Sequence, residues 1–245
     1  MADKKNKHID FGFKKISIGK KNDLVRDVFD NVASKYDLIN DISSIRLHRY
    51  WKDELINVLA PQPNQILGDL AGGTGDIAKR FLLNGGGKAD IIDINFNMIK
   101  MGLANKINLN LRHIVGNCEC IPIKENTYDR VSIAFGLRNI TYREEALKEI
   151  YRILKPGGRF VCLEFSHVED KFLRKLYDLW SFKFLPLIGK IVSDNRDAYQ
   201  YLVESIRMFP NQDQLSFLMS KTNFSRVKFK NLTQGVVAIH SGWKI

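Results

Sequence analysis

The sequence predicts an α/β fold with a mostly parallel sheet that helices cover on both faces. Short apolar runs typical of buried strands alternate along the chain with amphipathic segments typical of helices. The chain has 245 residues, of which 44% are hydrophobic, and this suits one globular domain with a sizeable core. Because repeated strand–helix alternation produces parallel strands, we expect a ligand at their carboxyl ends.

The first crossover carries the most informative motif of the chain. An apolar run typical of a strand begins at Ile66 and ends in an acid, Asp69, and the turn that follows holds Gly72, Gly73 and Gly75. Glycines permit a tight turn and a close approach of the backbone to a ligand. Apolar residues at helical spacing follow this turn: Ile77, Ala78, Phe81 and Leu82. The motif therefore predicts a nucleotide-like ligand at this point.

The later elements continue the same alternation. They are a strand over Ala89–Asp93, a helix near Asn97–Ala104, a short strand around Arg112–Val115, a loop over 116–122, a buried strand over Tyr128–Phe135, a helix over Arg143–Leu154, a turn over 155–158 and a strand over Arg159–Phe165.

Two cofactor classes fit the glycine turn. The segment 73–78 satisfies a relaxed dinucleotide pattern, but Asp69 and Asp76 would place negative charge where a pyrophosphate must bind. A cationic cofactor such as S-adenosylmethionine tolerates both acids. Asp93 ends the next strand at the spacing expected for a ribose-binding carboxylate in either class. Asp93 thus indicates nucleoside binding without naming the cofactor.

The domain organisation expected is a single domain over residues 22–245 behind a basic, flexible tail over 1–21. Within the domain we expect a helical lid over about 22–60 and an apolar insert over about 168–210. Lys and Arg outnumber Asp and Glu by 38 to 27, a net charge of +11. Such a charge suits nucleic acid or an acidic membrane face, and it is also compatible with an ordinary basic enzyme.

The cysteines and histidines favour neither disulfides nor a metal. Cys118 and Cys120 are too close for a zinc knuckle or an unstrained bridge, and the five histidines lack metal-ligand spacing. We expect reduced thiols and no metal. The sequence shows no signal peptide and no apolar run long enough to span a membrane, so a cytoplasmic, peripheral protein is expected.

Several motifs give the chain a close resemblance to the ubiquinone/menaquinone biosynthesis C-methyltransferases, which are class I S-adenosylmethionine-dependent methyltransferases. The resemblance extends from about Phe11 to the end of the chain. The Lys-Pro-Gly-Gly turn is common to many methyltransferases, whereas Phe-Gly-Leu-Arg-Asn and the segments around Tyr36 and Trp51 are specific to the family. The matching segments are 32–37, 40–41, 48–52, 69–76, 135–139, 154–158 and 205–208.

This resemblance implies a seven-stranded sheet whose last strand is antiparallel, and it implies specific cofactor contacts. Asp93 would accept the ribose hydroxyls, Asn117 and the backbone of Cys118 would meet the adenine, and Thr74 would hold the methionine moiety. Ala134 stands where several relatives carry a serine, which removes a hydroxyl contact. The cofactor-binding residues expected from motif and resemblance together are Asp69, Gly73, Thr74, Gly75, Asp93, Asn117, Cys118 and Ala134.

The implied reaction is methyl transfer to a ring carbon of a polyprenylated quinol. The acceptor would be a demethylmenaquinol, a 2-methoxy-6-polyprenyl-1,4-benzoquinol, or both. The ring carbon becomes nucleophilic once the neighbouring hydroxyl loses its proton. Arg138 and Asn139 are the first candidates to hold the phenolate, and Tyr36, Asp41 and His48 of the lid are secondary ones. An ion pair of Arg138 at the sheet end and a packed His48 are the structural alternatives.

The expected partners follow from the insert and the charge. Aromatic residues beside lysines over 172–192 suit an anionic bilayer, although packing on the core or on a second subunit in a homodimer explains them equally well. A nucleic-acid methyltransferase or RNA-binding protein is the main rival, beside a methyltransferase of another small molecule. Against nucleic acid, the sequence has no Asn-Pro-Pro-Tyr motif and its basic residues are dispersed. A non-catalytic scaffold among other quinone-biosynthesis enzymes is a further alternative, and the presence of Arg138 and Asn139 disfavours it.

Overall fold

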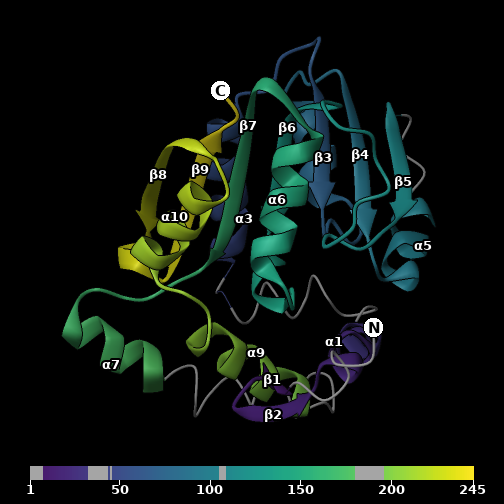
Figure 1. Cartoon of the computed structure of the whole chain (residues 1–245). Helices are drawn as coiled ribbons and strands as arrows, with labels where there is room; N and C mark the ends of the chain where they lie inside the picture. The colour runs from purple at the N-terminus through teal and green to yellow at the C-terminus, as the bar shows by residue number, and fades with distance from the viewer. Residues whose placement is uncertain (1–7, 33–43, 45, 105–108, 180–195) are drawn as a thin grey trace.

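A seven-stranded sheet organises the molecule (Figure 1). The computed structural model describes residues 8–32, 44, 46–104, 109–179 and 196–245. The strands of the sheet are β3 (Ile66–Leu70), β4 (Lys88–Asp93), β5 (Leu111–Val115), β6 (Tyr128–Ala134), β7 (Leu154–Phe165), β8 (Ser225–Leu232) and β9 (Val237–Trp243).

The order of the strands is β5-β4-β3-β6-β7-β9-β8. Strands β3 to β7 pair in parallel, whereas β9 runs antiparallel to both β7 and β8. The order reverses between β3 and β6, and such a reversal is where ligands bind in open α/β sheets. The predicted mostly parallel sheet with an antiparallel last strand is confirmed.

Helices cover both faces of this sheet, as predicted. Helix α6 (Arg143–Ile153) and helix α10 (Gln212–Lys221) bury their apolar residues in one core, with Ala146, Ile150 and Leu215 fully enclosed. Helix α3 (Leu47–Leu59) and helix α4 (Asp76–Leu83) form the core of the opposite face around Trp51 and Phe81. Helix α5 (Phe96–Ala104) contacts β4 and β5.

One local expectation was wrong. We expected a turn over 155–158, but these residues lie inside β7. Leu154 pairs with Tyr128 and Arg159 pairs with Arg130, so the four residues between form a bulge of the strand. Gly157 has a φ of 77°, which accounts for the turn-like sequence. The short helices η2 (Leu137–Asn139) and η4 (Thr233–Gly235) complete the elements near the sheet.

A cap lies beyond the carboxyl ends of the parallel strands (Figure 1). It consists of a hairpin of β1 (His8–Phe11) and β2 (Lys14–Ser17), helix α1 (Ile18–Val32) and helix α9 (Arg196–Arg207). The rings of Phe11 and Tyr201 stack with centroids 4.2 Å apart, and Phe13 N donates to Glu204 Oε2 at 2.9 Å. Residues 8–21 therefore pack on α9 instead of forming the flexible tail that we expected.

The helices of the expected lid and of the expected insert do not each form one unit, as we had predicted. Helix α1 belongs to the cap, but α3 packs on the sheet because Trp51, Leu55 and Leu59 are buried there. The expected insert contributes α9 to the cap, and it also contains helix α7 (Lys171–Leu179), which is not part of the cap. Residues 180–192 of the aromatic stretch over 172–192 lie outside the described residues. None of the described helices is long and apolar enough to cross a membrane.

Candidate functional site

A cleft opens at the carboxyl ends of β3, β4 and β6, where the strand order reverses. Helix α1 of the cap contributes Val25 and Arg26 to its walls. Most of the predicted cofactor residues line this cleft: Asp69, Gly73, Thr74, Asp93, Asn117, Cys118 and Ala134. Gly75 lies behind the wall, at the start of α4, with a φ of 82°. A Cβ there would meet Ile91 Cδ1 at 2.2 Å, so glycine is needed for packing.

Asp93 has the geometry expected of a ribose-binding carboxylate. Its Oδ2 accepts a hydrogen bond from Gly73 N at 2.8 Å, and its Oδ1 accepts one from Asn95 N at 2.8 Å. Burial raises the pKa of the Asp93 carboxyl, and these backbone donors oppose the rise. Each oxygen keeps acceptor capacity after these bonds. Asp93 is thus held with both oxygens able to accept hydroxyl donors of a diol in the cleft.

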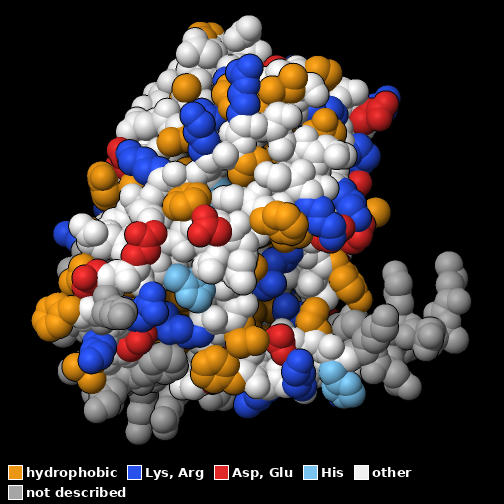
Figure 2. All heavy atoms as spheres, turned by 60° about the vertical axis from the view of Figure 1, so that its left-hand side comes forward, with side chains coloured by type: hydrophobic (Ala, Val, Ile, Leu, Met, Phe, Trp, Pro, Cys, Tyr) orange, Lys and Arg blue, Asp and Glu red, His pale blue; other side chains and the backbone are white. Residues whose placement is uncertain are grey.

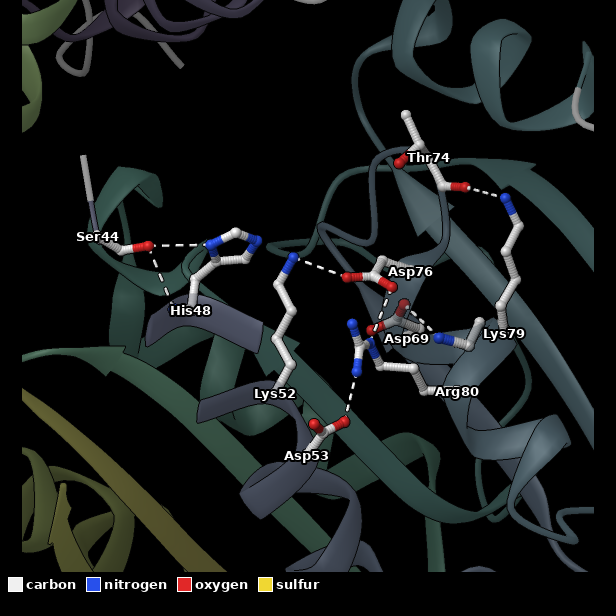
Figure 3. Close-up of polar contacts among 10 residues, drawn as sticks. Ser44, His48, Lys52, Asp53, Asp69, Thr74, Asp76, Lys79 and Arg80 are labelled. Carbon is white, nitrogen blue, oxygen red and sulfur yellow. Dashed lines mark hydrogen bonds and ion pairs between the residues drawn. The ribbon is translucent and has the colours of Figure 1, made fainter. Parts of the chain in front are cut away.

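Asp69 lies deeper, beneath the glycine turn (Figure 3). It accepts hydrogen bonds from Ser132 Oγ at 2.8 Å and from Ala78 N at 3.2 Å. Burial raises the pKa of Asp69 to about 7, because the two hydrogen bonds only partly offset the desolvation and the charges of Asp76 and Asp93 add to the rise. A cationic ligand in the cleft would lower this pKa.

The raised pKa of Asp69 predicts a pH-dependent loss of stability. Because the pKa is higher in the folded than in the unfolded chain, the contribution is complete below pH 3.8 and is lost as pH rises through about 7. The loss amounts to about 4 kcal/mol. We expect Asp69→Asn to lack this part of the pH dependence, so that the difference in unfolding free energy between wild type and variant changes by this amount over the interval. Urea unfolding of both ligand-free proteins at stepped pH measures the difference, and parallel curves would contradict the prediction.

A salt-bridge network joins the cleft to α3 (Figure 3). Lys52 Nζ lies 2.7 Å from Asp76 Oδ2, and Arg80 Nε lies 2.9 Å from Asp76 Oδ1. Arg80 also pairs with Asp53. Burial raises the pKa of the Asp76 carboxyl, but Lys52 and Arg80 outweigh this effect and the pKa is lowered. Asp76 therefore remains ionised at the start of α4.

Lys52 is a cleft residue that the sequence analysis did not select. It is only 6% exposed and lines the cleft beside Asp76. A signal was present, because Lys52 shares the buried face of α3 with Trp51, Leu55 and Leu59. A lysine on an apolar helix face requires a buried partner. Its partner, Asp76, lies on another element and could not be identified from the helix pattern.

The adenine end of the predicted site is formed by the segment after β5. Asn117 Oδ1 accepts from Glu119 N at 2.9 Å, which keeps the side chain in the loop. Burial raises the pKa of the Cys118 thiol to about 12, so Cys118 is a neutral, apolar part of the wall. Ala134 ends β6 and lines the cleft without a hydroxyl. This combination of apolar wall and amide suits a flat nucleobase.

The first two catalytic candidates lie on opposite sides of the same short helix. Asn139 lines the cleft, and its Oδ1 accepts from the Tyr201 hydroxyl at 3.0 Å. Arg138 lines a second cavity and is 7% exposed. Its Nη1 lies 3.0 Å from Glu164 Oε1 and also donates to the Phe135 carbonyl. The structure thus shows the ion pair that was the structural alternative for Arg138.

The lid candidates are not brought to the cleft among the described residues. His48 is buried in α3, where its Nδ1 lies 2.9 Å from Ser44 Oγ (Figure 3). Tyr36 and Asp41 lie outside the described residues. Over the described part of the chain, no cluster of His, Cys, Asp and Glu could hold a metal ion.

The cleft fits a cationic nucleoside. Asp93 presents carboxylate oxygens for a ribose. At the glycine turn Asp76 stays ionised beside Lys52 and Arg80, and a cationic ligand would favour the ionised form of Asp69, whose pKa is about 7. A dinucleotide pyrophosphate would meet these acids with repulsion. The residues present therefore fit S-adenosylmethionine better than a nicotinamide cofactor.

Comparison with known sequences gives a consistent result. The model of the ubiE/COQ5 methyltransferase family matches residues 17–244. A protein of Acidiphilium cryptum named ubiquinone/menaquinone biosynthesis C-methyltransferase UbiE is 46% identical over 249 residues, which cover 100% of both chains. A Dictyostelium discoideum protein named 2-methoxy-6-polyprenyl-1,4-benzoquinol methylase, mitochondrial, is 43% identical over 274 residues, covering 98% of this chain and 87% of that one.

Comparison with solved structures supports the fold. A SAM-dependent methyltransferase of Thermotoga maritima, described as a possible histamine N-methyltransferase, aligns with a TM-score of 0.64 at 19% identity, covering 89% of this chain and 98% of that one. A phosphoethanolamine N-methyltransferase of Haemonchus contortus, solved with S-adenosyl-L-methionine, aligns with a TM-score of 0.57 at 15% identity. The alignment covers 79% of this chain and 52% of that one.

Proposed function

The chain belongs to the ubiE/COQ5 methyltransferase family, and on that premise we propose that it transfers a methyl group from S-adenosylmethionine to a ring carbon of a polyprenylated quinol. The acceptors proposed are a demethylmenaquinol and a 2-methoxy-6-polyprenyl-1,4-benzoquinol, the classes of ring that the relatives' names point to. The observation that carries the proposal is the acid-lined cleft in a chain similar to these relatives over its whole length.

The residues of the cleft would hold the donor in a defined order. Asp93 accepts the ribose hydroxyls, Asn117 and Cys118 flank the adenine, and the turn at Gly73 and Thr74 receives the methionine moiety. S-Adenosylmethionine supplies an activated methyl group on a sulfonium. The chain mainly contributes positioning, because a bound and aligned donor needs little further activation.

The acceptor requires activation by removal of a hydroxyl proton. The resulting phenolate raises electron density on the neighbouring ring carbon, which takes the methyl group as the carbon–sulfur bond breaks to leave a neutral thioether. Loss of the ring proton then restores the aromatic ring. Asn139 lines the cleft where the acceptor must approach and remains a candidate to orient it. Arg138, Tyr36, Asp41 and His48 are the further candidates for contact with the acceptor.

A peripheral location on the cytoplasmic face of an anionic membrane is proposed from α7. Phe172 is 69% exposed, and Leu173 and Leu179 are exposed as well, beside the exposed Arg174 and Lys175. Such a surface suits a lipid interface from which a quinol with a long apolar tail would be drawn. The same residues also suit a homodimer contact or another enzyme of the pathway.

Nucleic acid is not a proposed partner. On the face shown in Figure 2, Lys and Arg side chains are spread among acidic, apolar and uncharged ones instead of forming one patch. A nucleic-acid surface gathers its basic residues in a stripe or groove.

Transfer of labelled methyl tests the proposed function. We expect product from one or both reduced acceptors with the wild-type protein, and none with Asp93→Ala. Extraction of labelled quinol from vesicles containing each acceptor measures this directly. Binding of S-adenosylmethionine without product from either quinol would contradict the acceptor class and favour the RNA methyltransferase or scaffold alternatives.

A further inference from the structure

The charged side chains that line the cleft are mostly acidic. Among the described residues they are Asp69, Asp76, Asp93, Glu119, Arg26 and Lys52. The two cations differ in burial. The side chain of Arg26 is 51% exposed and pairs with Asp23 of its own helix, whereas Lys52 is buried and pairs with Asp76 of another helix. Lys52 is thus the buried cation in the described wall of an otherwise acidic cleft.

The ammonium group of Lys52 is fixed in position and still able to donate. Its Nζ donates to Asp76 Oδ2 at 2.7 Å, and this is the hydrogen bond that it makes among the described residues (Figure 3). A lysine ammonium has three N–H donors, so two remain for a ligand in the cleft. Arg80 Nε holds the other oxygen of Asp76 at 2.9 Å. The salt-bridge network therefore places these donors at the wall without using them all.

The charges of this network balance. Lys52 and Arg80 carry two positive charges, and Asp76 and Asp53 carry two negative ones. A lone anion would gain little from a neutral network. A ligand group that holds both charges side by side would instead match Lys52 and Asp76, which present an ammonium and a carboxylate next to each other in the cleft. The amino-acid end of S-adenosylmethionine has this character, because its α-carboxylate and α-ammonium are bonded to one carbon.

The position of the pair along the cleft agrees with this match. Asn117, proposed to meet the adenine, follows β5, and Asp93, proposed to hold the ribose, ends β4. Asp76 begins α4 after β3, and Lys52 lies on α3, which packs against α4. Because β5, β4 and β3 are consecutive neighbours in the sheet, a nucleoside bound over β5 and β4 directs its 5′ substituent towards Asp76 and Lys52.

We infer that the Lys52–Asp76 pair recognises the amino-acid end of the methyl donor, with Lys52 binding its α-carboxylate and Asp76 its α-ammonium. The inference rests on the donor of the proposed function and is independent of the acceptor. Neither side chain takes part in the transfer itself. Both are already held in place by ion pairs, so the pair acts as a preformed specificity site for donors with a complete amino-acid group.

Three ligands that differ only at this end test the inference. S-Adenosylhomocysteine has both charged groups, S-adenosyl-3-thiopropylamine lacks the carboxylate, and 5′-methylthioadenosine lacks both. Isothermal titration calorimetry measures each affinity. We expect the wild-type protein to bind S-adenosylhomocysteine at least about 10-fold more tightly than S-adenosyl-3-thiopropylamine. Equal affinity of the wild type for these two ligands would overturn the inference.

Two variants assign the two charges separately. Lys52→Met should bind S-adenosylhomocysteine and S-adenosyl-3-thiopropylamine with affinities within about threefold of each other. Asp76→Asn should weaken the binding of S-adenosyl-3-thiopropylamine by about 10-fold. Both variants should bind 5′-methylthioadenosine as the wild type does, which shows that the nucleoside site is folded. In Lys52→Met the carboxylate of Asp76 keeps Arg80 as its partner.

Two further variants separate recognition from its alternatives. Lys148→Met, at an exposed lysine of α6 outside the cleft, should bind all three ligands as the wild type does. If Arg26→Met loses the preference for the carboxylate and Lys52→Met keeps it, the carboxylate is bound by Arg26 and the inference is overturned. Equal weakening of all three ligands by Lys52→Met would also overturn it, because Lys52 would then only hold α3 against α4.

Methyl transfer distinguishes this inference from the proposed function. With an active quinol acceptor, we expect Lys52→Met to raise the KM for S-adenosylmethionine by about 10-fold and to keep kcat within about threefold of wild type. An unchanged KM would refute the role of Lys52 alone. A wild type that shows the carboxylate preference but methylates neither quinol would refute the proposed acceptor and leave the amino-acid site standing. A wild type that binds no S-adenosylhomocysteine would refute both.

Discussion

Replacing Asp93 by alanine is expected to weaken S-adenosylmethionine binding by about 100-fold or more. Each hydrogen bond to a charged acceptor is worth about 1.5–3 kcal/mol, and two ribose hydroxyls would lose their partner. The backbone N–H groups of Gly73 and Asn95 would also lose the acceptor that holds the glycine turn. Isothermal titration calorimetry of the purified protein measures the affinity.

The matched control is an acid at the opposite edge of the sheet. Asp129 is the second residue of β6, accepts from Ile66 N at 2.9 Å and pairs with Lys155, away from the cleft. Asp129→Asn should bind S-adenosylmethionine as the wild type does. If Asp93→Ala stays folded and its affinity lies within threefold of wild type (about 0.7 kcal/mol), the ribose assignment fails.

Replacing Glu164 by alanine is expected to destabilise the protein by about 3–5 kcal/mol. Glu164 is 1% exposed and receives hydrogen bonds from Arg138 Nη1, Arg138 N and Phe165 N. Its removal leaves the 7% exposed Arg138 with an uncompensated charge and backbone donors without an acceptor. The free energy of unfolding in urea, compared at equal pH, gives the effect.

A double variant identifies the cause. Arg138→Met combined with Glu164→Ala removes the stranded charge and should be more stable than Glu164→Ala alone. A loss below about 1 kcal/mol for Glu164→Ala would show that water reaches the pair and screens its charges. A double variant as unstable as the sum of both single ones would show that charge compensation is not the cause.

The sheet and the position of the cleft at the strand ends were predictable because their signals lie within single strand–turn–helix units. The run from Ile66 to Asp76 specifies a strand, a turn and a helix start. The side chains at the end of this strand therefore lie at the carboxyl edge of the sheet, where ligands bind, independently of the other segments. Asp93 follows from the same rule one unit later. The bulge inside β7 was not predicted, because its glycine pattern is the same as that of a turn.

Arg138 shows the limit of such local signals. Its motif marks it as functional, yet the motif does not reveal that Glu164, on the next strand, neutralises it. Lys52 with Asp76 is likewise a pair of residues from separate elements. The hairpin before α1 packs on α9, near the far end of the chain, through Phe11 and Tyr201.

The amino-acid pattern was therefore sufficient for the fold class, the edge of the sheet at which the cleft lies and the family, since strand ends, glycine turns and helix periods depend on neighbouring residues. The charge states of the buried ionic side chains, and the residues that contact them, could be determined only from the tertiary structure. A buried ionic group needs a counter-charge or hydrogen-bond donors within a few ångströms. For a partner on another element, that distance is set by packing between segments whose order in the chain says nothing about their contact.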